Sequence, residues 1–161
     1  MENRIIDIYS KGEYPANILS NFYPNKFIFD GIECASMEGF LQSLKVKNAK
    51  KQEQMCSLIG IEAKKIGKYR FIWKVTGSVY WRGKKYKRDS FEFRDLIKKA
   101  YDAMYKENGG FREALLATKG KELKHSIGKH NPRKTILTEE EFVGCLNALR
   151  NEYDLKEQGC K

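Results

Sequence analysis

The stretch between residues 34 and 45 constrains the fold of this chain more than any other, because it predicts a helix with one apolar and one polar side. Ser36 is a suitable N-cap, so the helix is expected to begin near Met37. At about 100° per residue, one arc of its surface carries apolar side chains only, those of Met37, Phe40, Leu41 and Leu44. We therefore expect this stripe, Phe40 and Leu44 above all, to be buried in the core.

A second side of the same helix carries a carboxylate, an amide and an ammonium group. Glu38, Gln42 and Lys45 follow one another at intervals of four and three residues, so they stand in a row within about 60°. Such a row can form the wall of a polar pocket, although many solvated helix faces show the same pattern. Gly39 favours the pocket, because glycine inside a helix costs about 0.5–1 kcal/mol relative to alanine and indicates close approach of a backbone or a ligand.

Length and composition limit the class of protein. A chain of 161 residues, 41% hydrophobic and 12% aromatic, is expected to form one globular domain over residues 1–155, with a loose tail at 156–161. No apolar run is long enough to span a membrane, and the four cysteines form no C-x-x-C motif and do not cluster with the two histidines. We therefore expect a cytoplasmic protein with reduced thiols and no metal site.

The net charge is +10, and the positive residues are clustered. This balance suits a polyanionic partner, such as nucleic acid or a phosphorylated substrate, although a basic surface alone does not name one. The clusters are Lys45–Lys51, Lys64–Arg70, Arg82–Arg88 and Lys119–Lys134.

The remaining patterns predict a helix-rich α+β domain with a small β-sheet drawn mainly from the N-terminal third. Strands are expected at 5–9, at 71–75, and in hairpins over 27–34 and 79–86, the first turning at Asp30-Gly31. Helices are expected at 52–59 with Gly60 as C-cap, at 62–66, at 91–107 after the cap Ser90, at 111–118, and in a final helix that starts with the capping box Thr138-x-x-Glu141.

Three further stretches contain candidate binding residues, each with a plainer structural alternative. Ser20 and Asn21 interrupt an apolar and aromatic segment with Phe22 and Tyr23, either as a turn or as a polar pair presented to a ligand. The aromatic and basic run of Trp81, Arg82 and Arg88 suits flat bases and phosphates, or forms an ordinary hairpin with a core tryptophan. The glycine-punctuated basic loop with His125 and Lys129 suits phosphate, or is simply surface.

Several of these motifs together resemble the NADAR (YbiA-like) family. The resemblance rests on Ser20-Asn-Phe-Tyr-Pro24, Phe29-Asp-Gly31, Ser36-Met-Glu38 with Gln42 and Lys45, the Trp81 region, and the closing helix that ends near Arg150. The chain differs from the family pattern at Gly39 and in the region 125–138. The resemblance implies a YbiA-like fold over most of the chain and an N-glycosidase that cleaves a bond to ribose, with Glu38 as the essential glutamate and Lys45 as the helical lysine.

The resemblance also narrows the substrates, to an ADP-ribosylated guanine, free or in nucleic acid, or to phosphorylated riboflavin-pathway intermediates. Glu38 would stabilise an oxocarbenium-like state or activate water, and Lys45 would bind a hydroxyl or phosphate, or attack to form a Schiff base. Phe22, Tyr23 or Trp81 would stack on the departing base, and no cofactor is needed. The strong positive charge favours ADP-ribosylated guanine. A catalytically silent binder of ADP-ribose or of nucleic acid remains open, as does the oligomeric state.

Overall fold

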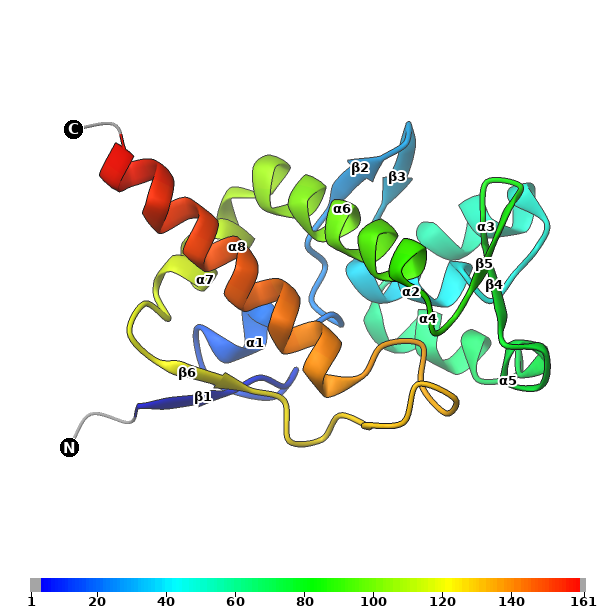
Figure 1. Cartoon of the computed structure of the whole chain (residues 1–161), viewed down its shortest axis with the longest axis horizontal. Coiled ribbons are helices and arrows are strands. Elements are labelled where there is room, and N and C mark those ends of the chain that lie inside the picture. Colours follow the sequence, from blue (N-terminus) through cyan, green and yellow to red (C-terminus); the bar gives the residue numbers. More distant parts are fainter. Residues whose placement is uncertain (1–3, 160–161) are drawn as a thin grey trace.

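Helices dominate the regular structure of the computed structural model, which describes residues 4–159 (Figure 1). The helices are α1 (Ala16–Leu19), α2 (Met37–Ser43), α3 (Ala49–Cys56), α4 (Gly60–Gly67), α5 (Ile72–Thr76), α6 (Phe91–Glu107), α7 (Gly109–Leu116) and α8 (Glu139–Gly159). The strands are β1 (Ile5–Asp7), β2 (Phe27–Phe29), β3 (Ile32–Cys34), β4 (Ser78–Trp81), β5 (Lys84–Lys87) and β6 (Glu122–Lys124). The predicted α+β class is confirmed.

The strands form three separate pairs where the sequence predicted one small sheet. β1 pairs in parallel with β6, whereas β2–β3 and β4–β5 are antiparallel hairpins. Both hairpins turn through two residues with positive φ, Asp30 and Gly31 in the first and Arg82 and Gly83 in the second. This is the two-residue turn whose twist matches that of the flanking strands, so the Asp-Gly signal predicted the first hairpin correctly.

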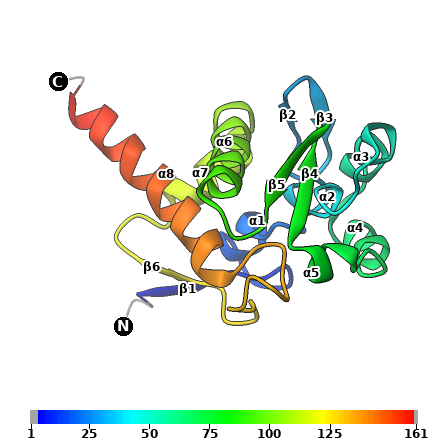
Figure 2. The same ribbon diagram turned by 45° about the vertical axis from the view of Figure 1, so that its right-hand side comes forward.

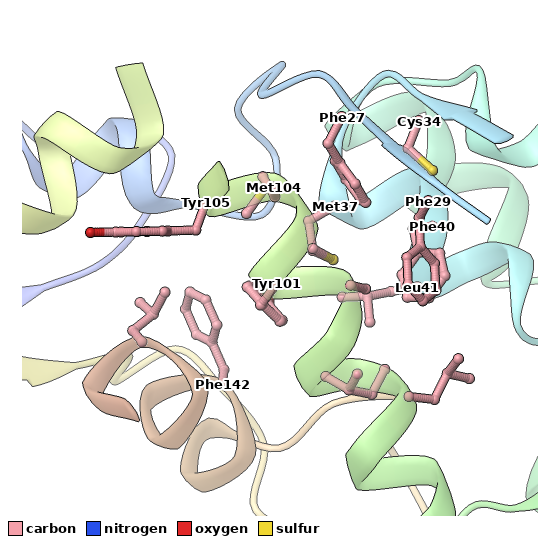
Figure 3. Close-up of a cluster of buried hydrophobic side chains, with 14 of the residues drawn as sticks. Phe27, Phe29, Cys34, Met37, Phe40, Leu41, Tyr101, Met104, Tyr105 and Phe142 are labelled. Atoms are coloured by element: carbon pink, nitrogen blue, oxygen red, sulfur yellow. The ribbon is translucent and has the colours of Figure 1, made fainter. Parts of the chain in front are cut away.

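The core is built around α6, which runs through the middle of the molecule between α2 and α8 (Figures 1 and 3). Its Tyr101 is fully buried and lies 6.1 Å from Phe142 of α8 between ring centroids. On the other side, Phe40 of α2 packs edge-on against Phe29 and Trp81 at 5.5 and 5.0 Å. The core therefore joins the helix of the candidate row to both halves of the chain.

Helix α2 has the features predicted from its sequence. It begins at Met37, and the Ser36 hydroxyl accepts a hydrogen bond from the Gly39 N–H at 3.1 Å. Phe40 and Leu44 are both fully buried. A Cβ atom on Gly39 would lie 2.6 Å from the carbonyl oxygen of Leu58, so another backbone does approach this glycine closely.

Two segments near the middle of the chain differ from the prediction. The segment 71–75, expected as a strand from its aromatic and β-branched residues, forms helix α5 instead, which ends at the left-handed Gly77. Gly60 does not end a helix but begins α4, after α3 has ended at Cys56. A Cβ atom at Gly60 would overlap the backbone of Phe22, which explains why glycine stands there.

The final helix confirms the predicted capping box and extends further than predicted. The Thr138 hydroxyl accepts from the Glu141 N–H at 3.1 Å, while the Glu141 carboxylate accepts from the Thr138 N–H at 2.9 Å. Of the tail expected at 156–161, residues 156–159 continue α8 to Gly159, and residues 160–161 lie outside the described part. Between residues 4 and 159, no helix combines the length and apolar character that a membrane span needs.

Candidate functional site

A cavity of about 270 Å³ lies where α2, the α4–α5 segment and two loops meet. One loop follows α1 and carries Ser20, Asn21 and Phe22, and the other carries residues 125–137 between β6 and α8. All three members of the predicted row on α2 line this cavity, namely Glu38, Gln42 and Lys45. The row therefore forms the wall of a polar pocket, and it is not a solvated helix face.

Glu38 is held in place through both its backbone and its carboxylate. Its N–H, in the first turn of α2, donates to the Asn21 carbonyl at 3.0 Å. Its Oε1 accepts a hydrogen bond of 2.7 Å from Nε2 of Gln42, one turn further along the helix. The second member of the row therefore orients the first.

Burial sets the protonation behaviour of Glu38, which is only 8% exposed. Removal from water raises the pKa of its carboxyl above the usual value, and this effect outweighs the hydrogen bond from Gln42 and the charges of Lys64 and Lys45. A carboxylate with a raised pKa is suited to exchange a proton near neutral pH, as general acids and bases do.

Lys45 shows the opposite shift. Burial lowers its pKa to about 8, helped by the positive charges of Lys74, Lys64 and Lys129, while the negative charge of Glu38 works in the other direction. Its Nζ lies 5.6 Å from the ring centroid of Trp73, within range of a cation–π contact. A substantial neutral fraction therefore exists at mildly alkaline pH, while the charged form predominates below it.

The loop after α1 closes one side of the cavity. Asn21 Oδ1 accepts a hydrogen bond of 2.7 Å from the fully buried Tyr101 hydroxyl, and this leaves the amide NH₂ group to donate elsewhere. The Ser20 hydroxyl accepts from the Phe22 N–H at 3.2 Å. Ser20 and Asn21 thus form a turn, as one alternative from the sequence predicted, and they also line the cavity.

The loop between β6 and α8 closes the other side. Nδ1 of His125 lies 2.7 Å from the Ile8 carbonyl oxygen, which can only accept, so Nδ1 carries the proton and Nε2 is the remaining ring nitrogen. The Lys129 carbonyl accepts from the Glu139 N–H at 2.9 Å, which ties the loop to the start of α8. Both predicted residues of this loop, His125 and Lys129, line the cavity.

Four predicted binding residues lie outside the cavity wall. Trp81 is a core residue that stacks on Phe29, and its Nε1 donates to Asp30 at 2.7 Å. Arg82 stands on the exposed hairpin turn and donates to the Asp30 carbonyl. Tyr23 is exposed beyond the end of the lining loop.

Arg88, the fourth of these residues, has a structural position. Its guanidinium forms a two-point ion pair with the Glu141 carboxylate at 3.1 and 2.6 Å and donates to the Thr135 carbonyl at 3.1 Å. Because Thr135 lines the cavity, Arg88 fastens the loop between β6 and α8 in place without reaching the cavity itself.

The sequence did not predict the contribution of α4 and α5. Six cations line the cavity in addition to Lys45, whereas Glu38 is the single acidic side chain among the cavity-lining residues of the described range. Lys64 and Lys68 stand four residues apart, a spacing that places them on one side of α4 and that the sequence already contained. The six are Lys64, Lys68, Arg70, Lys74, Lys129 and Lys134.

Two buried polar atoms in the cavity wall lack hydrogen-bond partners within residues 4–159. They are Oε1 of Gln42, an acceptor, and Nε1 of Trp73, a donor. A buried polar group without a partner costs about 1–3 kcal/mol, so both atoms are suited to a ligand that supplies the missing hydrogen bonds. No cluster of three or more His, Cys, Asp or Glu side chains that could hold a metal occurs in this described range.

Comparisons with known proteins agree with this architecture. A family model described as bacteriophage protein GP30.3 matches residues 13–151. An uncharacterised 17.1 kDa protein in the Gp30–rIII intergenic region of Enterobacteria phage T4 is 40% identical over 147 residues, which are 91% of this chain and 97% of that protein. The NMR structure of the E. coli protein YbiA has a TM-score of 0.66 at 18% identity and covers 98% of this chain and 89% of that one, which confirms the YbiA-like fold. The chain therefore belongs to the bacteriophage protein GP30.3 family, and it has the YbiA-like fold.

Proposed function

We propose that this protein is an N-glycosidase that removes ADP-ribose from ADP-ribosylated guanine. The observation that carries this proposal is one buried carboxylate, Glu38, beside Lys45 in a cavity whose other charged lining residues are all cations. Such a cavity suits a substrate whose reacting centre becomes cationic in the transition state and whose remainder is polyanionic. An N-ribosyl bond attached to a diphosphate has both properties.

Glu38 acts on the reacting carbon. As the glycosidic C–N bond breaks, its electron pair moves to the base, and positive charge develops on the anomeric carbon and ring oxygen of the ribose. The Glu38 carboxylate stabilises this charge or takes a proton from the attacking water, whose oxygen then bonds to the anomeric carbon. The proton that the water loses goes to the nitrogen of the departing base, so the base leaves as a neutral molecule. Gln42 holds the carboxylate through its 2.7 Å hydrogen bond, so the negative charge is oriented before the reaction.

Lys45 acts as a cation in this proposal. Its position over the Trp73 ring and near the charge of Glu38 favours the ammonium form, which binds a ribose hydroxyl or a phosphate oxygen. The alternative, attack by neutral Lys45 on the anomeric carbon to give a Schiff base, requires loss of that proton. The two roles make opposite predictions for the pH dependence of the reaction above the pKa of Lys45.

The diphosphate and the base have separate candidate partners. Lys64, Lys68 and Arg70 lie on the α4–α5 side of the cavity and suit the phosphates. Phe22 is half-buried in the wall, and the Nζ of Lys64 lies 5.3 Å from its ring centroid. Of the three aromatic residues predicted to stack on the base, Phe22 is therefore the one that the cavity makes available.

The test offers purified protein a small panel of substrates and detects products by mass spectrometry. The panel contains an ADP-ribosylated guanosine nucleotide, an ADP-ribosylated oligonucleotide and phosphorylated riboflavin-pathway intermediates. We expect free ADP-ribose to be released from the first two. Cleavage of the riboflavin-type compounds alone would replace the proposed substrate, and binding of ADP-ribose without any cleavage would identify a silent binder.

A further inference from the structure

The surface of α4 and α5 next to the cavity exposes large apolar side chains among cations. Tyr69, Phe71, Ile72 and Val75 are 72%, 62%, 71% and 84% exposed. Soluble proteins seldom expose several large apolar side chains so close together unless the surface binds a partner. We call the following six residues the α4–α5 surface: Lys65, Lys68, Tyr69, Phe71, Ile72 and Val75.

The α4–α5 surface is continuous with the cavity, because side chains that line the cavity alternate along the chain with side chains that are exposed on the surface. Lys68, Arg70 and Lys74 line the cavity, whereas Tyr69 and Phe71, which stand between them in the sequence, are exposed beside it. Both views of the fold place α4 and α5 together at one end of the molecule, below α2 and α3 (Figures 1 and 2). A long ligand that enters the cavity would therefore pass over this surface.

We propose that the α4–α5 surface binds the single-stranded DNA that flanks the modified base while that base occupies the cavity. This inference rests on the proposed function, and it names the surface that holds the strand on either side of the modified base. The binding would combine stacking of neighbouring bases on Tyr69 and Phe71 with a phosphate contact to Lys65, which does not line the cavity.

The charges and rings on this surface match a nucleic acid better than they match a protein. The segment from residue 61 to residue 75 contains five cations and a single acidic residue, Glu62. The Nζ of Lys68 lies 5.1 Å from the ring centroid of Tyr69, so a cation and an aromatic ring stand together as they do in channels for single strands. An apolar protein surface would cover the rings but leave these charges without partners.

Two features favour a single strand of DNA. A base inside a duplex stays stacked, and it cannot bring its N-ribosyl bond to a carboxylate that is 8% exposed at the cavity wall. Exposed rings can stack only on bases that are already unstacked. The methyl groups of Ile72 and Val75 suit deoxyribose and the thymine methyl group, and they offer nothing to a 2′-hydroxyl.

The direct test measures binding of an unmodified, fluorescently labelled oligodeoxythymidine of about 12 nucleotides by anisotropy. We expect Tyr69→Ala and Phe71→Ala each to weaken binding roughly 5- to 100-fold. Phe91→Ala is the matched control, because Phe91 is 74% exposed on a different helix and does not line the cavity, and it should bind like the wild type. Lys65→Gln should lower the slope of log affinity against log salt by about 0.7.

Equal affinity of the wild type and both alanine variants would overturn the proposal, as would equally tight binding of duplex DNA or of single-stranded RNA. Self-association that Phe71→Ala abolishes, without DNA binding, would identify a dimer contact and would also overturn it. Sedimentation velocity detects that outcome.

Hydrolysis assays separate this inference from the proposed function. The ratio of the rate on a modified oligonucleotide to the rate on the free nucleotide should fall in Phe71→Ala and stay constant in Phe91→Ala. Cleavage of the nucleotide without any DNA binding would refute the docking surface alone. Aromatic-dependent DNA binding without cleavage of either substrate would support the docking surface and refute the N-glycosidase.

Discussion

Replacing Gly39 by alanine should disturb the fold and the site together. The added Cβ would lie 2.6 Å from the Leu58 carbonyl oxygen and 3.0 Å from that of Met55. The first distance is about 0.8 Å short of the 3.4 Å at which ordinary contact begins. Because both atoms belong to the backbone, they cannot rotate away, and α2 must move away from the end of α3.

The expected magnitude combines two opposing terms. Overpacking of this kind costs about 1–3 kcal/mol, whereas alanine in place of glycine inside a helix recovers about 0.5–1 kcal/mol. We therefore expect the free energy of unfolding to fall by about 1 kcal/mol, and by no more than about 2.5 kcal/mol. Because Glu38 precedes Gly39 on α2, the movement of α2 away from α3 should also misplace the Glu38 carboxylate. A misplacement of 1 Å can lower turnover by about 10²-fold.

Denaturant melts followed by circular dichroism measure the first effect, and initial rates of ADP-ribose release measure the second. Gly144→Ala in α8 is the matched control, because a Cβ at Gly144 would meet nothing within 4 Å. That variant should gain about 0.5–1 kcal/mol and keep its activity. A Gly39→Ala protein that is as stable and active as Gly144→Ala would refute the close approach of α3 to α2.

Three further predictions concern the core and the row on α2. Leu44→Ala should lower the free energy of unfolding by about 2–5 kcal/mol in the same melts, while Leu155→Ala, at a position that is 70% exposed, should change it little. Glu38→Gln should melt at or above the wild-type temperature at neutral pH, because the folded state raises the pKa of Glu38 and its ionised form therefore costs stability. The difference in melting temperature between the two proteins should vanish near pH 4, at about the unfolded pKa. The pH profile of kcat/KM should rise on the acid side as Glu38 ionises and fall as Lys45 loses its proton near its pKa of about 8. If Lys45 acts as a cation, Lys45→Arg should move the alkaline limb of the profile to higher pH.

The parts of the fold that follow local patterns were predictable from sequence. The stripe and cap of α2, the limits of α6 and the capping box of α8 each depend on side chains within a few residues of one another, and the structure confirms all three. Gly39 also gave a correct indication, because a glycine inside a helix needs a reason that lies outside the helix.

The errors have long-range causes. The segment 71–75 has the composition of a strand, yet the left-handed Gly77 ends a short helix there, with Trp73 buried against the cavity and Phe71 and Val75 exposed. Trp81 and Arg88 were assigned to the substrate because aromatic and basic residues often bind nucleotides. Only the packing of Trp81 on Phe29, and the pairing of Arg88 with Glu141, which is far away in sequence, show that both are structural.

The cations of α4 and α5 illustrate the same limit for the site. Their positive charge was visible in the sequence, but their distance from α2 was not. The structure brings Lys64 and Lys68 to the cavity that holds Glu38, while the basic hairpin at Arg82 stays outside it. The cations that line this cavity are therefore partly different residues from those that the sequence assigned to the substrate.

The central claim is that the Glu38 carboxylate drives cleavage of an N-ribosyl bond, and one comparison tests it most directly. Wild-type and Glu38→Gln proteins are given the same ADP-ribosylated guanosine nucleotide; binding is measured by calorimetry and ADP-ribose release by mass spectrometry. Glutamine keeps the shape and the ability to accept from Gln42 but removes the charge, so affinity should persist while turnover falls by about 10²-fold or more. A folded Glu38→Gln protein that releases ADP-ribose at the wild-type rate would contradict the claim.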